Sequence, residues 1–194
     1  MQKIGLFFGS FNPIHKGHLQ LACYFADNTD LDCIWFVITA QSPFKQGNKT
    51  LPNQERLALV SRAISAYPKL EVSTIEFELP QPNYTFHTLS ELKKQFPQNT
   101  FSLLLGADNI SAFDQWKAYD QILVNYKLYI YPRKTKTKLP DEFLNHPKII
   151  WSDAPKIEIS SSQIRKRIKE GKDVSSLIPE ASYDYLMENN FYHS

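Results

Sequence analysis

The N-terminal stretch places an apolar run directly before a glycine-containing turn. Residues 4–8 read Ile-Gly-Leu-Phe-Phe and are followed by Gly9. A continuous apolar run of this length, ended by glycine, is typical of a strand buried on both faces of a parallel sheet. Residues at helical spacing follow at 18–28, and a second apolar, β-branched run covers 33–40. The start of the chain therefore predicts a strand–helix–strand unit.

The same alternation continues along the rest of the chain. We expect further strands at 70–75, 101–106, 127–131 and 149–151, and further helices from Asn53, at 85–96, 161–170 and 179–189. Such alternation predicts an α/β fold with a doubly wound, mostly parallel sheet and helices on both faces. At 194 residues, 1–194 is expected to form a single domain.

The segment at 132–147 (PRKTKTKLPDEFLNHP) interrupts this alternation. It is polar, basic and bounded by prolines, so we expect an exposed loop. Its lysines, Lys134, Lys136 and Lys138, are more often solvated than bound to phosphate, and contact with a phosphate group is the less favoured alternative.

The overall charge and the cysteines exclude some classes of function. Twenty-two Lys and Arg against 20 Asp and Glu give a net charge of +2, so no global field favours nucleic acids or membranes, and phosphate binding needs a local site. The first apolar run is too short for a signal peptide, and no run approaches the ~20 residues of a membrane helix. A cytoplasmic protein is expected. Cys23 and Cys33 lack CxxC spacing, which favours buried thiols.

The turn GSFNPIHKGH, at 9–18, is the strongest candidate for a site. Ligands of parallel sheets bind beyond the carboxyl ends of the strands, and this turn follows the first predicted strand. It is neither GxGxxG nor a P-loop. Gly9 would let a ligand approach the main chain, Pro13 would stiffen the turn, and Gly17 would leave space beside a helix N-terminus that attracts anions. His15 and His18 would add directed donors.

Two other interpretations of the histidine pair remain. Zinc needs three or four ligands, and no further His or Cys stands at suitable spacing. Histidines satisfied within a core are the second alternative, which the location of the pair in a loop disfavours.

Two segments resemble the nucleotidyltransferase superfamily. GSFNPIHKGH is similar to its (H/T)xGH signature, and SSSQIR at 160–165 is similar to its ISSTxxR motif, with Ser162 where threonine is usual. NYTFHTL at 83–89 and GADNISAFDQW at 106–116 resemble the YTxxTL and GADxxxxxxxW segments of bacterial nicotinate-nucleotide adenylyltransferases. PFK at 43–45 stands where many members have PHK, so Phe44 replaces the usual histidine.

The resemblance implies a Rossmann-like nucleotidyltransferase fold in which C-terminal helices, from about residue 160, pack on the sheet and close the ATP site. It implies adenylyl transfer from ATP to nicotinate mononucleotide in NAD synthesis. Magnesium would accompany ATP through phosphate and water oxygens, and no residue is expected to bind the metal. Alternative activities are the adenylylation of phosphopantetheine, another small-molecule nucleotidyl transfer, and a non-catalytic adenylate-binding module.

The resemblance also assigns roles to residues. The catalytic residues would be His15, His18, Lys45 and Arg165. ATP would contact His18, Arg165 and a set of turn residues, namely Gly9, Ser10, Phe11, Gly106, Asp108, Ser160 and Ser161. The mononucleotide would contact Tyr84, Thr85 and Trp116, because an indole can stack on a pyridine ring and a helix start offers donors to a carboxylate. Trp116 as plain packing, and Asp108 as a helix cap, are the alternatives.

Overall fold

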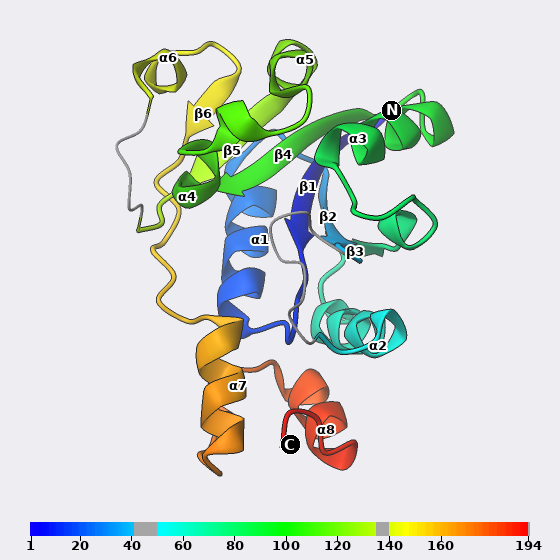
Figure 1. The fold of residues 1–194 in the computed structure, drawn as a ribbon, viewed down its shortest axis with the longest axis vertical. Coiled ribbons are helices and arrows are strands. Elements are labelled where there is room, and N and C mark those ends of the chain that lie inside the picture. Colours follow the sequence, from blue (N-terminus) through cyan, green and yellow to red (C-terminus); the bar gives the residue numbers. More distant parts are fainter. Residues whose placement is uncertain (41–49, 135–139, 194) are drawn as a thin grey trace.

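The computed structural model, which describes residues 1–40, 50–134 and 140–193, is built on a parallel sheet (Figure 1). Six strands lie in the order β3-β2-β1-β4-β5-β6, and every neighbouring pair is parallel. The strands are β1 (Lys3–Gly9), β2 (Cys33–Ile38), β3 (Leu70–Ser73), β4 (Thr100–Gly106), β5 (Lys127–Tyr131) and β6 (Ile149–Trp151). This order reverses between β1 and β4 and confirms the predicted doubly wound α/β fold.

Helices cover both faces of the sheet and enclose one apolar core on each side. One core includes side chains from α1 (Lys16–Asn28), α2 (Asn53–Ile64), α7 (Ser161–Lys169) and α8 (Glu180–Glu188). The other includes side chains from α3 (Thr85–Gln95), α4 (Ala107–Ile110), α5 (Tyr119–Asn125) and α6 (Asp141–Leu144). Because both faces are covered, six of the seven residues of β4 and four of the seven residues of β1 are buried, in line with their apolar sequences.

Several boundaries differ from the sequence-based predictions. The first helix begins at Lys16, two residues early, because the turn before it caps its N-terminus. The strand expected at 70–75 ends at Ser73, and a 3₁₀ turn, η2 (Ile75–Phe77), follows. Helix α5 was not predicted. The expected loop at 132–147 contains α6, which forms because Phe143, only 1% exposed, anchors it to the core. Lys136 and Lys138 lie outside the described residues.

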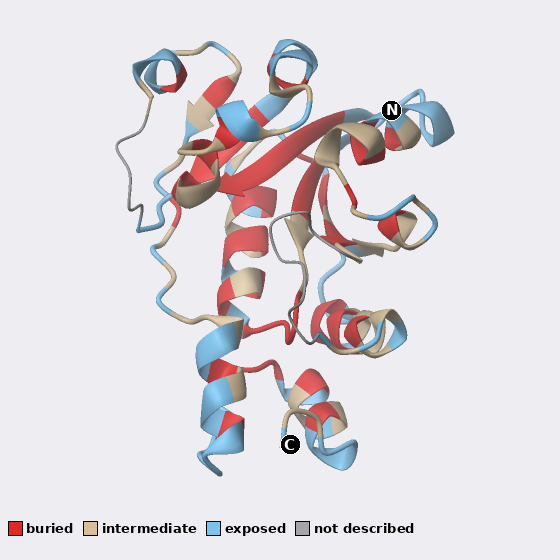
Figure 2. Cartoon of the chain, in the orientation of Figure 1, coloured by how far each residue is buried: buried red, intermediate tan, exposed pale blue. Residues whose placement is uncertain are grey.

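Helix α7 lies beyond the end of α1, and α8 lies beside α2 (Figure 1). Helix α8 packs against α2, where the Ser182 hydroxyl donates to the carbonyl of Leu59 at 2.7 Å. Side chains of α7 and α8 also belong to the core on this face of the sheet. Their inward side chains, Ile164 and Leu186 among them, are buried, while much of the outer surface of α7 is exposed (Figure 2).

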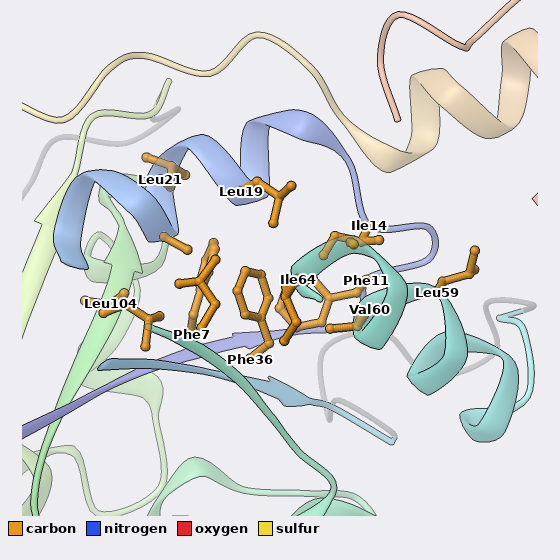
Figure 3. Close-up of a cluster of buried hydrophobic side chains, with 14 of the residues drawn as sticks. Phe7, Phe11, Ile14, Leu19, Leu21, Phe36, Leu59, Val60, Ile64 and Leu104 are labelled. Carbon is orange, nitrogen blue, oxygen red and sulfur yellow. The ribbon is translucent and has the colours of Figure 1, made fainter. Parts of the chain in front are cut away.

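The core beside β1 fixes the turn that leaves this strand. Phe7, Phe11 and Phe36 meet with ring centroids 5.2–5.8 Å apart (Figure 3). Phe11 has a φ of 44°, in the left-handed region, and only 2% of it is exposed. Its burial supplies the energy that holds a non-glycine residue in this disfavoured conformation. The turn after β1 is therefore anchored in the core.

Candidate active site

A cavity of about 1020 Å³ opens at the carboxyl ends of β1 and β4. The strand order reverses there, which is where open α/β sheets bind ligands. At one end, called here the loop end, the cavity is lined by residues from 9–18 and 160–165. At the other, called the aromatic end, it is lined by residues from 81–85 and 112–117.

Most of the residues predicted to form a site line this one cavity. The structure brings together Gly9, Ser10, Phe11, His15, His18, Tyr84, Thr85, Asp108, Trp116, Ser160, Ser161 and Arg165. Gly106 ends β4 beside this cavity. Lys45, with Pro43 and Phe44, lies outside the described residues.

The two histidines sit face to face at the N-terminus of α1. Their ring centroids are 3.6 Å apart with an interplanar angle of 21°. The Nδ1 of His18 accepts a hydrogen bond from the main-chain N–H of His15 at 3.2 Å. An accepting Nδ1 leaves the proton of a neutral imidazole on Nε2, so this contact makes His18 a donor through Nε2.

His15 is held in its neutral form. It is 4% exposed, and its Nδ1 is buried with no hydrogen-bond partner among the described residues. Burial, reinforced by the positive charge of Arg133, lowers its pKa to about 4. Two stacked rings would repel each other if both were cationic. The pair therefore offers directed N–H groups rather than two full charges.

Two glycines around this turn are closely packed by protein side chains. A Cβ on Gly9 would lie 2.8 Å from the ring of Phe11. A Cβ on Gly17 would lie 2.3 Å from Cγ2 of Ile157. Gly9 and Gly17 thus lie close against Phe11 and Ile157, and both also line the cavity, so the approach of a ligand to these positions stays a prediction. Phe11 also packs beneath His18, 5.1 Å between ring centroids.

The start of α7 is tied to the turn after β1. The Ser160 hydroxyl accepts from the main-chain N–H of Gln163 and caps the helix. The Ser161 hydroxyl donates to the carbonyl of Pro13 at 2.9 Å. Arg165 donates from Nη1 to the carbonyl of Asn12 at 2.7 Å and from Nη2 to the Ser162 hydroxyl at 3.3 Å. A guanidinium and a helix N-terminus therefore stand beside the two imidazoles, an arrangement suited to anions.

The aromatic end combines rings with the start of another helix. Thr85 is the first residue of α3, and Tyr84 precedes it in extended conformation. Trp116 is half-buried and packs on Phe113, 5.3 Å between ring centroids, while it also lines the cavity. Lys117 places Nζ 4.8 Å from the ring centre of Tyr84. Packing and a platform for a planar ligand are therefore compatible roles for Trp116.

A buried carboxyl group, Glu76, supports the aromatic end. It is 2% exposed and lines the cavity, and its Oε1 accepts from the Thr88 hydroxyl at 2.8 Å. Its Oε2 is buried with no hydrogen-bond partner in the described parts of the chain. Burial raises the pKa of Glu76 to about 7, against the opposing effects of Thr88 and Arg56. Asn83 also donates to the carbonyl of Glu76 at 3.1 Å, so Glu76 links η2 to the start of α3.

Asp108 and Arg133 face each other across the ends of β4 and β5. Nε of Arg133 lies 3.5 Å from Oδ2 of Asp108, whose Oδ1 is buried and unpartnered among the described residues. The N-cap of α4 is Gly106, so Asp108 does not cap this helix. A Cβ on Gly106 would lie 2.3 Å from Oδ1 of Asp108, so glycine at this position makes room for the carboxylate.

The sequence analysis missed several of these groups. Arg133 follows β5, and the rule that ligands bind beyond the carboxyl ends of strands would have found it. Glu76 carries no local signal. Arg56 is 1% exposed and donates to the carbonyls of Ser10 and Thr39, both at 2.8 Å. These contacts join distant parts of the chain, so no sequence pattern indicates them.

The cysteines, possible metal-ligand clusters and possible membrane helices were also considered in the sequence. Cys33 is buried and Cys23 half-buried, both are free thiols, and burial raises the pKa of each. In the described ranges no cluster of three or more His, Cys, Asp or Glu side chains is placed to hold a metal ion. No helix within those ranges is long and apolar enough to cross a membrane.

Comparison with known proteins identifies close relatives. Residues 6–167 match the model of the family described as cytidylyltransferase-like. The chain is 48% identical to a probable nicotinate-nucleotide adenylyltransferase of Christiangramia forsetii, with 98% of both chains covered. It is 47% identical to the protein of the same name from Flavobacterium psychrophilum, again with 98% of both covered.

A solved structure shares the fold. The nicotinic acid mononucleotide adenylyltransferase of Plasmodium falciparum, complexed with NaAD, matches with a TM-score of 0.81 at 22% identity. The match covers 100% of this chain and 98% of that one. It agrees with the doubly wound sheet described above.

Proposed function

Because the chain belongs to the cytidylyltransferase-like family and, within it, to the nicotinate-nucleotide adenylyltransferases, we propose that it transfers the adenylyl group of ATP to nicotinate mononucleotide. The products are nicotinate adenine dinucleotide and pyrophosphate, as in NAD synthesis. A reaction that consumes ATP fits a cytoplasmic enzyme acting on small molecules.

The observation that carries this proposal is the pairing of two unlike ends in one cavity. The loop end gathers His15, His18 and Arg165 with the N-terminus of α7, which are donors for phosphate oxygens. The aromatic end offers Trp116 and the start of α3 at Thr85, which suit a planar ring that carries a carboxylate. A triphosphate and a pyridine mononucleotide need these two environments side by side.

The proposed mechanism is a direct displacement. The 5′-phosphate of the mononucleotide attacks the α-phosphorus of ATP, the bond to the bridging oxygen breaks, and pyrophosphate leaves with the electron pair. The nucleophile is already anionic, so no general base is needed, and the protein contributes positioning and charge stabilisation. His18 donates from Nε2 to an α-phosphate oxygen, and His15 stands beside it.

The other residues hold the two nucleotides in place. Arg165 and the main-chain N–H groups at the start of α7 contact the β- and γ-phosphates. Asp108 accepts from a ribose hydroxyl of ATP. For Lys45, which lies outside the described residues, the family resemblance implies a positive charge that interacts with the phosphates. Magnesium arrives as part of the MgATP substrate, held through phosphate and water oxygens.

Steady-state kinetics with alternative acceptors test the proposal. Purified protein receives MgATP with nicotinate mononucleotide, nicotinamide mononucleotide or phosphopantetheine, and pyrophosphate release is measured. We expect the highest kcat/KM with nicotinate mononucleotide, because the helix start at Thr85 favours a carboxylate over a neutral amide. Faster turnover of phosphopantetheine would support the related adenylyltransferase. ATP binding without turnover of any acceptor would support a non-catalytic adenylate-binding module.

A further inference from the structure

Asn12 is a junction between three distant parts of the chain. It lies in the turn after β1, three residues before His15, and is 2% exposed. Its carbonyl accepts from Arg165 at 2.7 Å. Its side-chain Oδ1 accepts from the main-chain N–H of Leu51 at 3.2 Å and from the hydroxyl of Tyr192 at 2.5 Å. The chain just before α2, helix α7 and the segment after α8 therefore meet on one residue.

Tyr192 reaches this junction from the segment that follows α8. Its ring is half-buried beside Phe191, 6.4 Å between centroids, and Phe191 packs on Tyr185 at 5.8 Å. Burial raises the pKa of the Tyr192 phenol, while the charges of Arg165 and Arg56 oppose this rise. The phenol therefore keeps its proton at neutral pH and donates it to Asn12.

The backbone between Gly9 and His15 is held from outside at three carbonyls. Arg56 donates to Ser10, Arg165 to Asn12 and Ser161 to Pro13. The hydroxyl of Tyr192 adds a contact that fixes the side chain of Asn12. Without this phenol, Oδ1 of Asn12 would keep only the amide of Leu51 as a described donor.

We propose that Tyr192 is a positioning residue for adenylyl transfer, acting through Asn12 to fix the backbone that carries His15 and His18 and the carbonyl that orients Arg165. This inference rests on the proposed function. Tyr192 does not line the cavity, so it acts through the residues that do. A small displacement of positioned donors lowers the rate of the chemical step more than it weakens substrate binding.

The test compares Tyr192→Phe with Tyr185→Phe. Both variants remove one phenol hydroxyl from the C-terminal part of the chain and keep the ring. The Tyr185 hydroxyl donates to Oε2 of Glu55 at 2.6 Å, which does not touch the turn after β1. A purely structural role predicts equal effects on activity from the two variants, so Tyr185→Phe is the matched control.

We expect Tyr192→Phe to lower kcat about tenfold, the size of one lost hydrogen bond, with little change in KM for the mononucleotide. Tyr185→Phe should keep kcat within about twofold of the wild type. Rates are compared at a temperature where melting curves show all proteins folded. Equal losses in the two variants, or an unchanged kcat in Tyr192→Phe, would overturn the proposal.

A second measurement separates this inference from the proposed function. Hydrogen–deuterium exchange of peptides that cover 10–18, and of the amide of Leu51, needs no turnover. We expect faster exchange there in Tyr192→Phe and not in Tyr185→Phe. Unchanged exchange would show that Tyr192 does not position this turn, even if the enzyme is active. If the wild type does not turn over the mononucleotide, the proposed function fails while the exchange experiment still decides the role of Tyr192.

Discussion

The two ends of the cavity are built in opposite ways. At the loop end, Ser161, Arg165 and Tyr192 contact residues that are 148, 153 and 180 positions away in sequence. At the aromatic end, Glu76 and Thr88 stand twelve positions apart, and Glu76 and Asn83 seven. The loop end is thus fixed by contacts between distant parts of the chain, whereas the contacts of Glu76 with Asn83 and Thr88 at the aromatic end lie within one short segment.

Burial shifts the pKa in opposite directions at the two ends, because one buried group is an imidazole and the other a carboxyl. Burial lowers the pKa of His15 to about 4 and raises that of Glu76 to about 7. In each case the neutral form is favoured. Burial thus favours the neutral forms of His15 and Glu76, while Arg133 and Arg165 bring positive charge to the same cavity.

The largest expected effect is at the loop end. His18→Ala should lower kcat by about 10² to 10³, because it removes one preorganised donor. Gln20→Ala, on an exposed position of the same helix, is the control and should leave kcat unchanged. Steady-state rates with saturating MgATP and nicotinate mononucleotide measure both. Near-normal turnover by a folded His18→Ala protein would show that His18 is not a catalytic donor, and the loop end would then not give the largest effect.

Glu76 should give the aromatic end its own dependence on pH. The pKa of Glu76 is 4.5 in the unfolded chain and about 7 in the folded protein. Burial of Glu76 therefore costs no stability below pH 4.5, where the group is neutral in both states. As pH rises towards 7 the free energy of unfolding falls, by at most about 3 kcal/mol. His15 acts in the opposite sense: its pKa falls from 6.5 to about 4, so its contribution to stability is lost as pH falls from 6.5.

Glu76→Gln should therefore remove the loss of stability between pH 4.5 and 7 and leave the rise with pH that His15 produces. Urea denaturation at several pH values measures this, with Glu78→Gln, an exposed neighbour, as the control. If Glu76→Gln and Glu78→Gln show the same pH dependence, Glu76 titrates as an ordinary surface carboxylate and the contrast between the ends is wrong.

A smaller effect is expected for the ring platform. Trp116→Ala should raise KM for nicotinate mononucleotide about tenfold, the size of one lost stacking contact, with little change in KM for ATP. Trp151→Ala, on β6 and 37% exposed, is the matched control. A raised KM for ATP instead would place the indole against the adenine, and a large fall in melting temperature alone would make Trp116 a packing residue.

The smallest expected effect links the loop end to Arg133. The positive charge of Arg133 helps to lower the pKa of His15, so Arg133→Gln should raise that pKa. The shift should be modest because the Arg133 side chain is 49% exposed and water screens it. NMR titration of the His15 ring measures it, with Lys134→Gln as the control. A pKa that stays the same or falls would show that burial alone sets it.

The contrast between the two ends also explains what could be predicted from the sequence. Strands such as β1 and β4 are buried on both faces, so their apolar runs stand out, and the parallel order followed from the alternation with helices. Helix α5 (YDQILVN) is only seven residues long, too short to show helical periodicity. The segments at 9–18 and 83–89 were visible because each is continuous in sequence.

The parts of the site that could not be predicted from the sequence are those that come together only on folding. Arg56 and Tyr192 reach the turn after β1 from positions 46 and 180 residues away, counted from Ser10 and Asn12 respectively. Glu76 acquires its altered pKa only by burial. The close packing of Phe11 on Gly9 and of Ile157 on Gly17 was not predicted either. Such contacts are set by three-dimensional packing and leave no local pattern.

The distance along the chain between Pro13 and Ser161 has a consequence for synthesis. The ribosome makes the histidine turn early, yet its partners on α7 follow 148 residues later. A nascent chain can pair β1 with β2, and add the contacts of Leu51 and Arg56, long before the contacts from α7 are possible. The contacts of Ser161 and Arg165 with this turn can therefore form only after residues 161–165 have been synthesised.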